Sequence, residues 1–451
     1  MLEKTERQNF LYRLQEWFGS DFTAVFFLIF GVLCFIFDLA DVLVISYVSA
    51  FILTLVFCKR VNNIFAYLFY VPFFISTIAL NDGRWSVFIP VVVLAAVTVL
   101  IFTAYKIIDE RSKINLGKMF YPLIAFTVAM VIGGAVGRFN VTVFFVILGF
   151  CIEIFCFYLI AINCTENLSK SLAIFFIVGG IFVFLCYAYY YIDNGIVWKD
   201  WAIIFTSAQN INTGSIFIAL GIAGCLYLGA GKKNDYLYAL LSIVMFIMIV
   251  ITQCRTVTAI SAALLIVEYV LFFVYSENKR IILCVALFFI AAVSVLTAAF
   301  FEEVKIYAEK FLKKGSNGGI GIREDLWQWC FDRFKEYPYF GYGYICDDAV
   351  PTIVSFYPNL VLAHNTVLHW LTVTGVVGTS IAVYFYCGKY YSLFSRFNKN
   401  KIFHTLCILT IALSGTFDQS PTMDIFVLVA TVAILAASEK PPEKGFISNA
   451  Y

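Results

Sequence analysis

Three side chains next to apolar segments could bind and react with a phosphorylated substrate. Arg255 lies in the short segment ITQCRTVTA, Arg323 lies in a longer polar stretch, and His364 begins the segment HNTVLHW. Arginine binds phosphate groups through the paired donors of its planar guanidinium and keeps its charge at ordinary pH. Histidine exchanges a proton near neutral pH, so it can act as a general base on a hydroxyl group. This combination would suit transfer of a group from a diphosphate to a hydroxyl.

Each of these residues also has a purely structural interpretation. Arg255 could reach from the end of a membrane span to the interface, or pair with Asp418 or Asp424 in the turn FDQSPTMD. A single interfacial histidine is more often structural than catalytic. His369 lies five residues beyond His364, about 140° around a helix, so the two need not share a face. The choice between the interpretations depends on the elements that position these residues.

The composition excludes a soluble enzyme. Of the 451 residues, 62% are hydrophobic and only 13% are charged, whereas soluble domains average about 45–50% apolar and about 25% charged residues. The mean hydropathy is +0.89. The 31 Lys and Arg residues nearly balance the 29 Asp and Glu residues, which leaves no strong basic field for binding nucleic acid. The chain is therefore predicted to be a polytopic membrane protein.

Apolar segments of membrane-helix length recur along the whole chain. A helix needs about 20 mostly apolar residues to cross a hydrocarbon core of about 30 Å. We predict spans near residues 22–37, 42–58, 64–80, 87–105, 119–136, 141–161, 171–191, 213–230, 236–252, 259–275, 281–301, 364–386, 402–417 and 425–437. The shortest are weaker candidates, so the predicted fold class is an all-α polytopic transmembrane helix bundle of about 12–14 spans.

Lys and Arg in the short connections indicate which ends of the spans face the cytoplasm. With a cytoplasmic N-terminus, the short inner connections hold fifteen of these residues and the short outer connections hold four. The positive-inside rule therefore places both termini in the cytoplasm. The resulting division is an N-terminal transmembrane part (1–301), one large external loop (302–363), C-terminal transmembrane helices (364–437) and a cytoplasmic tail (438–451).

The external loop is the one outer segment long enough to fold into more than a turn. Residues 304–312 form an amphipathic pattern that suits either an interfacial helix or a helix that caps the bundle. A second amphipathic pattern covers residues 322–334, and Pro338 is expected to end that helix. A disulfide between Cys330 and Cys346 is an open alternative, on weak evidence.

Motifs for nucleotides and metals are missing. The segment GSNGGIG lacks the Gly-Lys-Ser/Thr ending of a phosphate-binding loop, and no His, Cys and carboxylate spacing typical of a transition-metal site occurs. No metal and no cofactor are expected.

An ordered set of motifs in the last third of the chain resembles the O-antigen ligase and O-antigen polymerase superfamily of bacterial inner-membrane glycosyltransferases. The resemblance covers about residues 236–425, and Cys254 stands where a serine is expected. The motifs are TQCR at 252–255, Arg323 with Trp327, the segment YPYFGYG with Pro338, Gly341 and Gly343, the pair His364-Asn365, and the later Gly375 and Gly378.

The resemblance implies a glycan donor carried on undecaprenyl diphosphate and used at the periplasmic face of the inner membrane. Arg255 and Arg323 would hold the diphosphate, and His364 would be the general base on the acceptor hydroxyl. The further substrate-binding candidates are Gln253, Asn365, Asp418, Gly341 and Gly343.

Two questions stay open. The acceptor could be the lipid A–core saccharide, as in a ligase, or a second lipid-linked glycan, as in a repeat-unit polymerase, and we favour the ligase. A transporter or flippase is the alternative from another class. It would require charged residues near the bilayer centre and often two repeated halves, whereas the polar residues here gather at one face. Besides these glycans, only membrane lipids are expected as partners.

Overall fold

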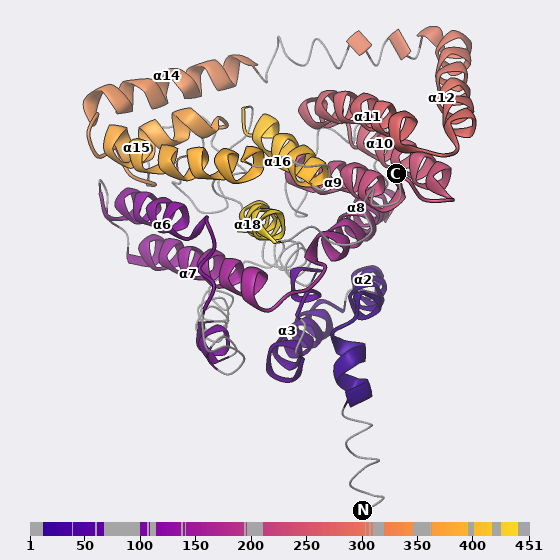
Figure 1. The fold of residues 1–451 in the computed structure, drawn as a ribbon. Coiled ribbons are helices and arrows are strands. Elements are labelled where there is room, and N and C mark those ends of the chain that lie inside the picture. The colour runs from indigo at the N-terminus through magenta and orange to yellow at the C-terminus, as the bar shows by residue number, and fades with distance from the viewer. Residues whose placement is uncertain are drawn as a thin grey trace, which may run out of the picture.

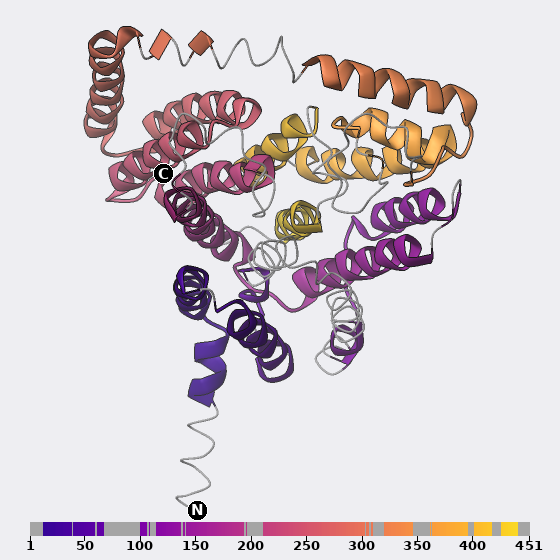
Figure 2. The same cartoon turned by 180° about the vertical axis from the view of Figure 1, so that it is seen from behind.

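Backbone groups in hydrocarbon must satisfy their hydrogen bonds within the chain, so the apolar segments fold into helices. The computed structural model describes residues 12–58, 61–66, 100–105, 114–136, 141–193, 211–302, 320–345, 361–395, 401–416 and 425–440, without residues 38 and 362 and with some isolated positions between these ranges. Figures 1 and 2 show the bundle from opposite sides. The prediction of an all-α, multi-pass membrane bundle is confirmed.

The main helices range from 13 to 29 residues in length. In chain order they are α2 (Asp21–Ile36), α3 (Ala40–Phe57), α6 (Phe120–Ala135), α7 (Val141–Asn163), α8 (Leu168–Asp193), α9 (Ile211–Gly229), α10 (Asp235–Thr252), α11 (Arg255–Tyr275), α12 (Lys279–Ala299), α14 (Ile320–Glu336), α15 (Thr366–Phe394), α16 (Ile402–Ser414) and α18 (Ile425–Glu439).

Most predicted spans coincide with one of these helices. The exceptions, 64–80 and 87–105, lie mostly outside the described residues. In the described part, six helices are long and apolar enough to cross a membrane, or seven if the bent pair Tyr12–Phe18 and Asp21–Ile36 is one span. The predicted number of 12–14 includes helices that are too short for this, such as α16 with 13 residues, about 20 Å long.

A short apolar helix is stable here because protein surrounds it. Helix α18 lies in the middle of the bundle (Figure 1), and its residues from Val427 to Ala437 are buried. A helix that is apolar on every side belongs in such an interior. By contrast α12 lies at the edge and exposes large apolar side chains, including Phe288 and Val295, as expected of a helix that faces lipid.

Connections predicted to lie on the same side of the membrane do meet. At the inner end, the backbone N–H of Lys118 donates to the carboxylate of Glu439 at 2.6 Å, and His404 Nε2 lies 3.0 Å from Ser169 Oγ. At the outer end, the N–H of Thr366 donates to the carbonyl of Gly415 at 3.0 Å. His364 and Asn365 lie directly before Thr366, at this predicted outer end.

Candidate active site

Helix α15 is broken at Gly375. This residue has φ 62° and ψ −166°, values that only glycine adopts readily, and the helix kinks there. In an unbroken helix the N–H groups of Val376 and Val377 would donate to the carbonyls of Thr372 and Val373. The kink separates these partners and leaves two donors and two acceptors that must bond elsewhere.

The loop that follows α14 supplies the missing partners. Its backbone, residues 337–344, runs along the kink, and we call it together with residues 372–377 the junction. The four hydrogen bonds run from Tyr342 N to Thr372 O (2.7 Å), from Gly343 N to Val373 O (3.1 Å), from Val376 N to Pro338 O (2.8 Å) and from Val377 N to Tyr339 O (3.0 Å).

Glycines make this close approach of backbones possible. A Cβ at Gly341 would lie 2.4 Å from the carbonyl oxygen of Val373, and one at Gly343 would lie 2.4 Å from that of Val136. Both glycines have positive φ, 81° and 89°. Gly341 and Gly343 were predicted as substrate-binding residues, and the structure gives them a packing role at the junction.

The kink divides a helix that is longer than a membrane is thick. The whole helix of 29 residues is about 43 Å long, more than the hydrocarbon core of about 30 Å. The predicted span of 364–386 lies within this helix, apart from its first two residues.

Helix α14 packs against the first part of α15 through its apolar face. Leu326 and Cys330 are buried, as the pattern predicts, and the helix ends at Glu336, just before Pro338. Cys330 is a buried thiol, while Cys346 lies outside the described residues, so the disulfide alternative is not tested.

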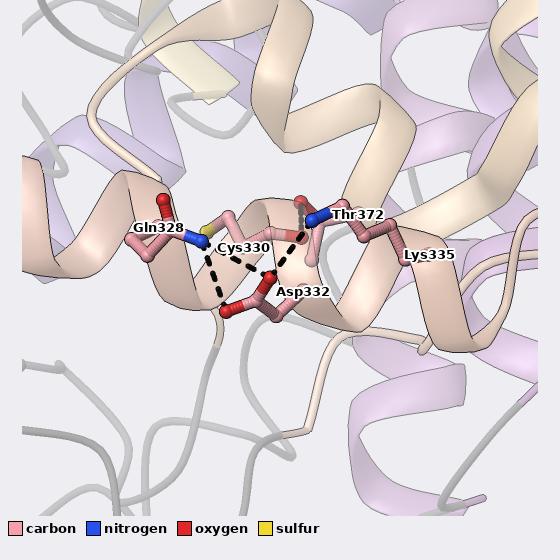
Figure 3. A network of polar contacts seen from close by, with 5 residues as sticks. All are labelled: Gln328, Cys330, Asp332, Lys335 and Thr372. Carbon is pink, nitrogen blue, oxygen red and sulfur yellow. Dashed lines mark hydrogen bonds and ion pairs between the residues drawn. The ribbon is translucent and has the colours of Figure 1, made fainter.

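Two polar contacts fix α14 to α15. The indole N–H of Trp327 donates to the carbonyl of Ala363 at 2.8 Å, directly before His364. The hydroxyl of Thr372 lies 3.3 Å from the carbonyl of Cys330 (Figure 3). These contacts connect the loop helix to both ends of the first segment of α15.

The opposite side of α14 carries a solvated polar network (Figure 3). Gln328 donates to both carboxylate oxygens of Asp332 at 3.1 Å, and Lys335 lies 3.3 Å from one of them. The hydrogen bonds from Gln328, and then the charge of Lys335, hold the pKa of Asp332 below its usual range. This exposed network stabilises the helix and does not face α15.

His364 is held in an uncommon backbone conformation at the start of α15. Its φ of 47° is in the left-handed region, which few residues other than glycine adopt. The next residue, Asn365, caps α15 by accepting the N–H of Leu368 at 2.9 Å, and its amide donates to the carbonyl of Thr416 at 3.1 Å. Asn365, predicted to bind substrate, thus has a structural role at the meeting point of α15 and α16.

His369, five residues after His364, is buried. It is 1% exposed, and among the described residues neither ring nitrogen has a hydrogen-bond partner. Its ring lies 6.0 Å from that of Tyr344, which packs against Gly133 of α6. Burial raises the pKa of the Tyr344 hydroxyl, so this loop residue stays protonated. The burial of His369 and Tyr344 next to each other was not predicted from the sequence.

Arg255 and Gln253 occupy the tight turn that the sequence predicts between two spans. Gln253 ends α10 in the left-handed conformation, with φ 57° and ψ 21°. Arg255 is the first residue of α11 and is partly buried. Helix α11 packs against α16, and the end of α16 bonds to the start of α15.

The remaining predicted residues cannot be placed relative to this group. The backbone of Arg323 is in the first turn of α14, but its side chain is outside the described residues, as are Asp418 and Asp424. The structure thus brings His364 and Asn365 together with α14 and α16, and puts Gly341 and Gly343 at the junction.

Replacing Gly375 by alanine tests the junction. We expect Gly375→Ala to lower the free energy of unfolding by more than about 2 kcal/mol, because the new Cβ would lie 2.5 Å from Tyr339 backbone atoms at a positive φ. Thermal unfolding of the purified protein in detergent measures this. The matched control is Gly149→Ala in α7, where a Cβ meets nothing within 4 Å. Equal melting temperatures for both variants would contradict the role of the kink.

A second substitution tests how His364 is positioned. Trp327→Phe keeps an aromatic ring but removes the hydrogen bond to Ala363, a loss of about 1 kcal/mol. We expect amide hydrogen exchange in peptides covering 363–370 to become about fivefold faster. Trp329→Phe, which leaves the bond from Trp327 intact, should not change exchange there. Unchanged exchange in the Trp327 variant would show that α14 does not hold this segment.

A comparison with curated proteins finds none that matches the chain. Residues 240–383, from α10 through the kink of α15, match a protein-family model described as O-antigen ligase. The matched region contains Arg255, Arg323 and His364 together with the junction. Members of this family are glycosyltransferase-like enzymes. The resemblance to the O-antigen ligase and polymerase superfamily is therefore confirmed through this domain.

Proposed function

We propose that the chain transfers a glycan from undecaprenyl diphosphate to a sugar hydroxyl at the periplasmic face of the bacterial inner membrane. The observation that carries this proposal is that His364 lies inside the region that matches the O-antigen ligase family, next to the contact between the start of α15 and the end of α16. The Lys and Arg bias supports cytoplasmic termini and an outer site.

His364 is proposed to act as the general base. It would accept the proton of the acceptor hydroxyl while the oxygen forms a bond to the anomeric carbon of the donor glycan. The bond from that carbon to the diphosphate oxygen breaks, and undecaprenyl diphosphate leaves with the electron pair. Fixed contacts on both sides of His364 support this role, because a base must be held within hydrogen-bond reach of its substrate.

Arg255 and Arg323 are proposed to stabilise the leaving diphosphate. Negative charge develops on it as the glycosidic bond breaks, and positioned guanidinium groups can stabilise that charge without a metal ion. The position of Arg255 supports this, because it begins α11 and the N-terminus of a helix also favours an anion. Gln253 and Asp418 remain proposed substrate-binding residues.

The acceptor is proposed to be lipid A–core saccharide, which makes the chain an O-antigen ligase. The family match does not separate this reaction from polymerisation onto a second lipid-linked glycan. The preference rests on the motif set from TQCR to His364-Asn365. The two reactions differ in product, so a product assay decides between them.

Substitutions at the three proposed catalytic residues test the mechanism. In an assay of glycan transfer from undecaprenyl diphosphate, His364→Ala should lower kcat by a factor of about 10²–10⁴, the usual contribution of a general base. Arg255→Lys and Arg323→Lys keep the charge but lose the paired donors, so each should lower kcat/KM at least about tenfold. Arg280→Lys, at an exposed position at the predicted inner end of α12, is the matched control. The mechanism is wrong if all three variants keep full activity while remaining folded.

Deletion of the gene in its host tests the acceptor. For a ligase, a lipopolysaccharide gel should lose every O-chain band, and long polymer should accumulate on the carrier lipid. A ladder reduced to core plus one repeat unit would instead show a polymerase. An unchanged ladder, with no change in the lipid-linked glycans, would contradict both reactions in lipopolysaccharide synthesis.

A further inference from the structure

The hairpin of α15 and α16 carries an unbalanced positive charge at the end opposite the proposed active site. The chain has no Asp or Glu between Asp348 and Asp418, whereas the connection between the two helices reads SRFNKNK over residues 395–401. Lys389 adds a further charge within α15 itself. The hairpin therefore cannot neutralise these cations with its own side chains.

Lys389 is buried without a carboxylate. It is 3% exposed, and its ammonium group lies 5.3 Å from the ring centres of Tyr386 and Tyr390. No ion pair to it is found in the part of the chain that the structure describes. Such a burial is costly, and aromatic rings compensate it only in part.

The neighbouring helices do not supply a counter-ion either. Helix α15 packs against α6, α14 and α18. The acidic residues of α14 belong to a helix that contacts the opposite end of α15, at Ala363 and Thr372. The sole acidic residue within α6, α16 and α18 is Glu439. Its carboxylate already accepts hydrogen bonds from the N–H groups of Lys118 and Met119 and from the hydroxyl of Tyr158.

Further hydrogen-bond donors follow Lys389 within two turns, at the same end of α15. The hydroxyls of Ser392 and Ser395 are buried and have no hydrogen-bond partner among the described residues. Lys401 approaches the same residues, and its ammonium group donates to their carbonyls at 2.8 and 3.0 Å. Two ammonium groups and two unused hydroxyls form a set of donors suited to an anion.

We propose that this inner end of the α15–α16 hairpin binds the phosphate of an anionic phospholipid through Lys389, Lys401, Ser392 and Ser395. Gly388 packs against Pro122 in the first turn of α6, so Lys389 lies at the level where the helices reach the inner membrane face. Large apolar side chains beside the site, Tyr391 (69% exposed) and Phe394 (51%), offer a surface for the acyl chains. A basic site between helices on the cytoplasmic side is suited to an anionic headgroup.

Basic residues at an inner membrane face also determine how a membrane protein is oriented. Burial distinguishes a lysine that binds a lipid phosphate from one that only sets this orientation. A charge that only sets orientation can remain in solvent, as the exposed Lys233 does. Lys389 is withdrawn into the bundle beside unused hydroxyls, an arrangement that orientation does not require.

Native mass spectrometry of the full-length protein in detergent tests the proposal. Titration with phosphatidylglycerol should give a bound-lipid species at an about tenfold lower concentration than titration with phosphatidylcholine. Lys389→Met, which keeps the length of the side chain, should remove this preference. Lys389→Arg should retain it, and so should the matched control Lys233→Met. The readout is lipid retention, so it does not depend on whether the chain transfers glycans.

Several results would overturn the proposal. A Lys389→Met variant that keeps the full preference for phosphatidylglycerol would show that the site is elsewhere. If inorganic phosphate alone at the same concentration raised the melting temperature as much as phosphatidylglycerol, the ligand would be a free anion and not a lipid. Should Lys389→Met fail to fold, the double variant Ser392→Ala, Ser395→Ala provides the same comparison, and an unchanged lipid preference there would count against the site.

Discussion

The exchange of backbone hydrogen bonds at Gly375 is the constraint on which the arrangement of α14 and α15 depends. Interrupting an α-helix in a membrane costs free energy unless each freed N–H and C=O group finds a new hydrogen-bond partner. Here the two bonds lost within α15 are replaced by four bonds to the loop after α14. The kink and the loop therefore require each other, and neither would be stable in this form alone. The position of α14 follows, since the loop begins where that helix ends.

The same constraint separates α15 into parts with different environments. Before the kink, residues 366–374 contact α14, the end of α16 and, through Trp370, Phe126 of α6. After it, the helix packs on α6 and α18 and ends with the buried Lys389 and the serine hydroxyls. One helix thus connects the proposed site of glycan transfer at one face with the proposed lipid site at the other.

Much of the fold could be predicted because it depends on local patterns. Hydropathy locates the helices. The 3.6-residue spacing of apolar residues identifies the buried face of α14 around Leu326 and Cys330. The turn at Gln253 is expected because two predicted spans adjoin there. The junction could not be predicted in this way. Pairing between residues 338–343 and 372–377 joins distant segments through backbone atoms, which leave no side-chain pattern. Gly341 and Gly343 were noticed as motif residues, but only the structure shows which backbone each of them approaches.

The conformation of His364 shows what the surrounding helices contribute to the proposed chemistry. A residue with φ 47° stores strain, and an isolated helix start would relax it. Here the preceding carbonyl is held by Trp327, and the following residues are held by Asn365 and by the end of α16. The strain therefore persists because contacts from two other helices fix both sides of the histidine. It follows that α14 and α16, together with the Asn365 cap of α15, determine the backbone position of the proposed base. This explains why a long external loop helix and a short buried helix belong to the same functional unit.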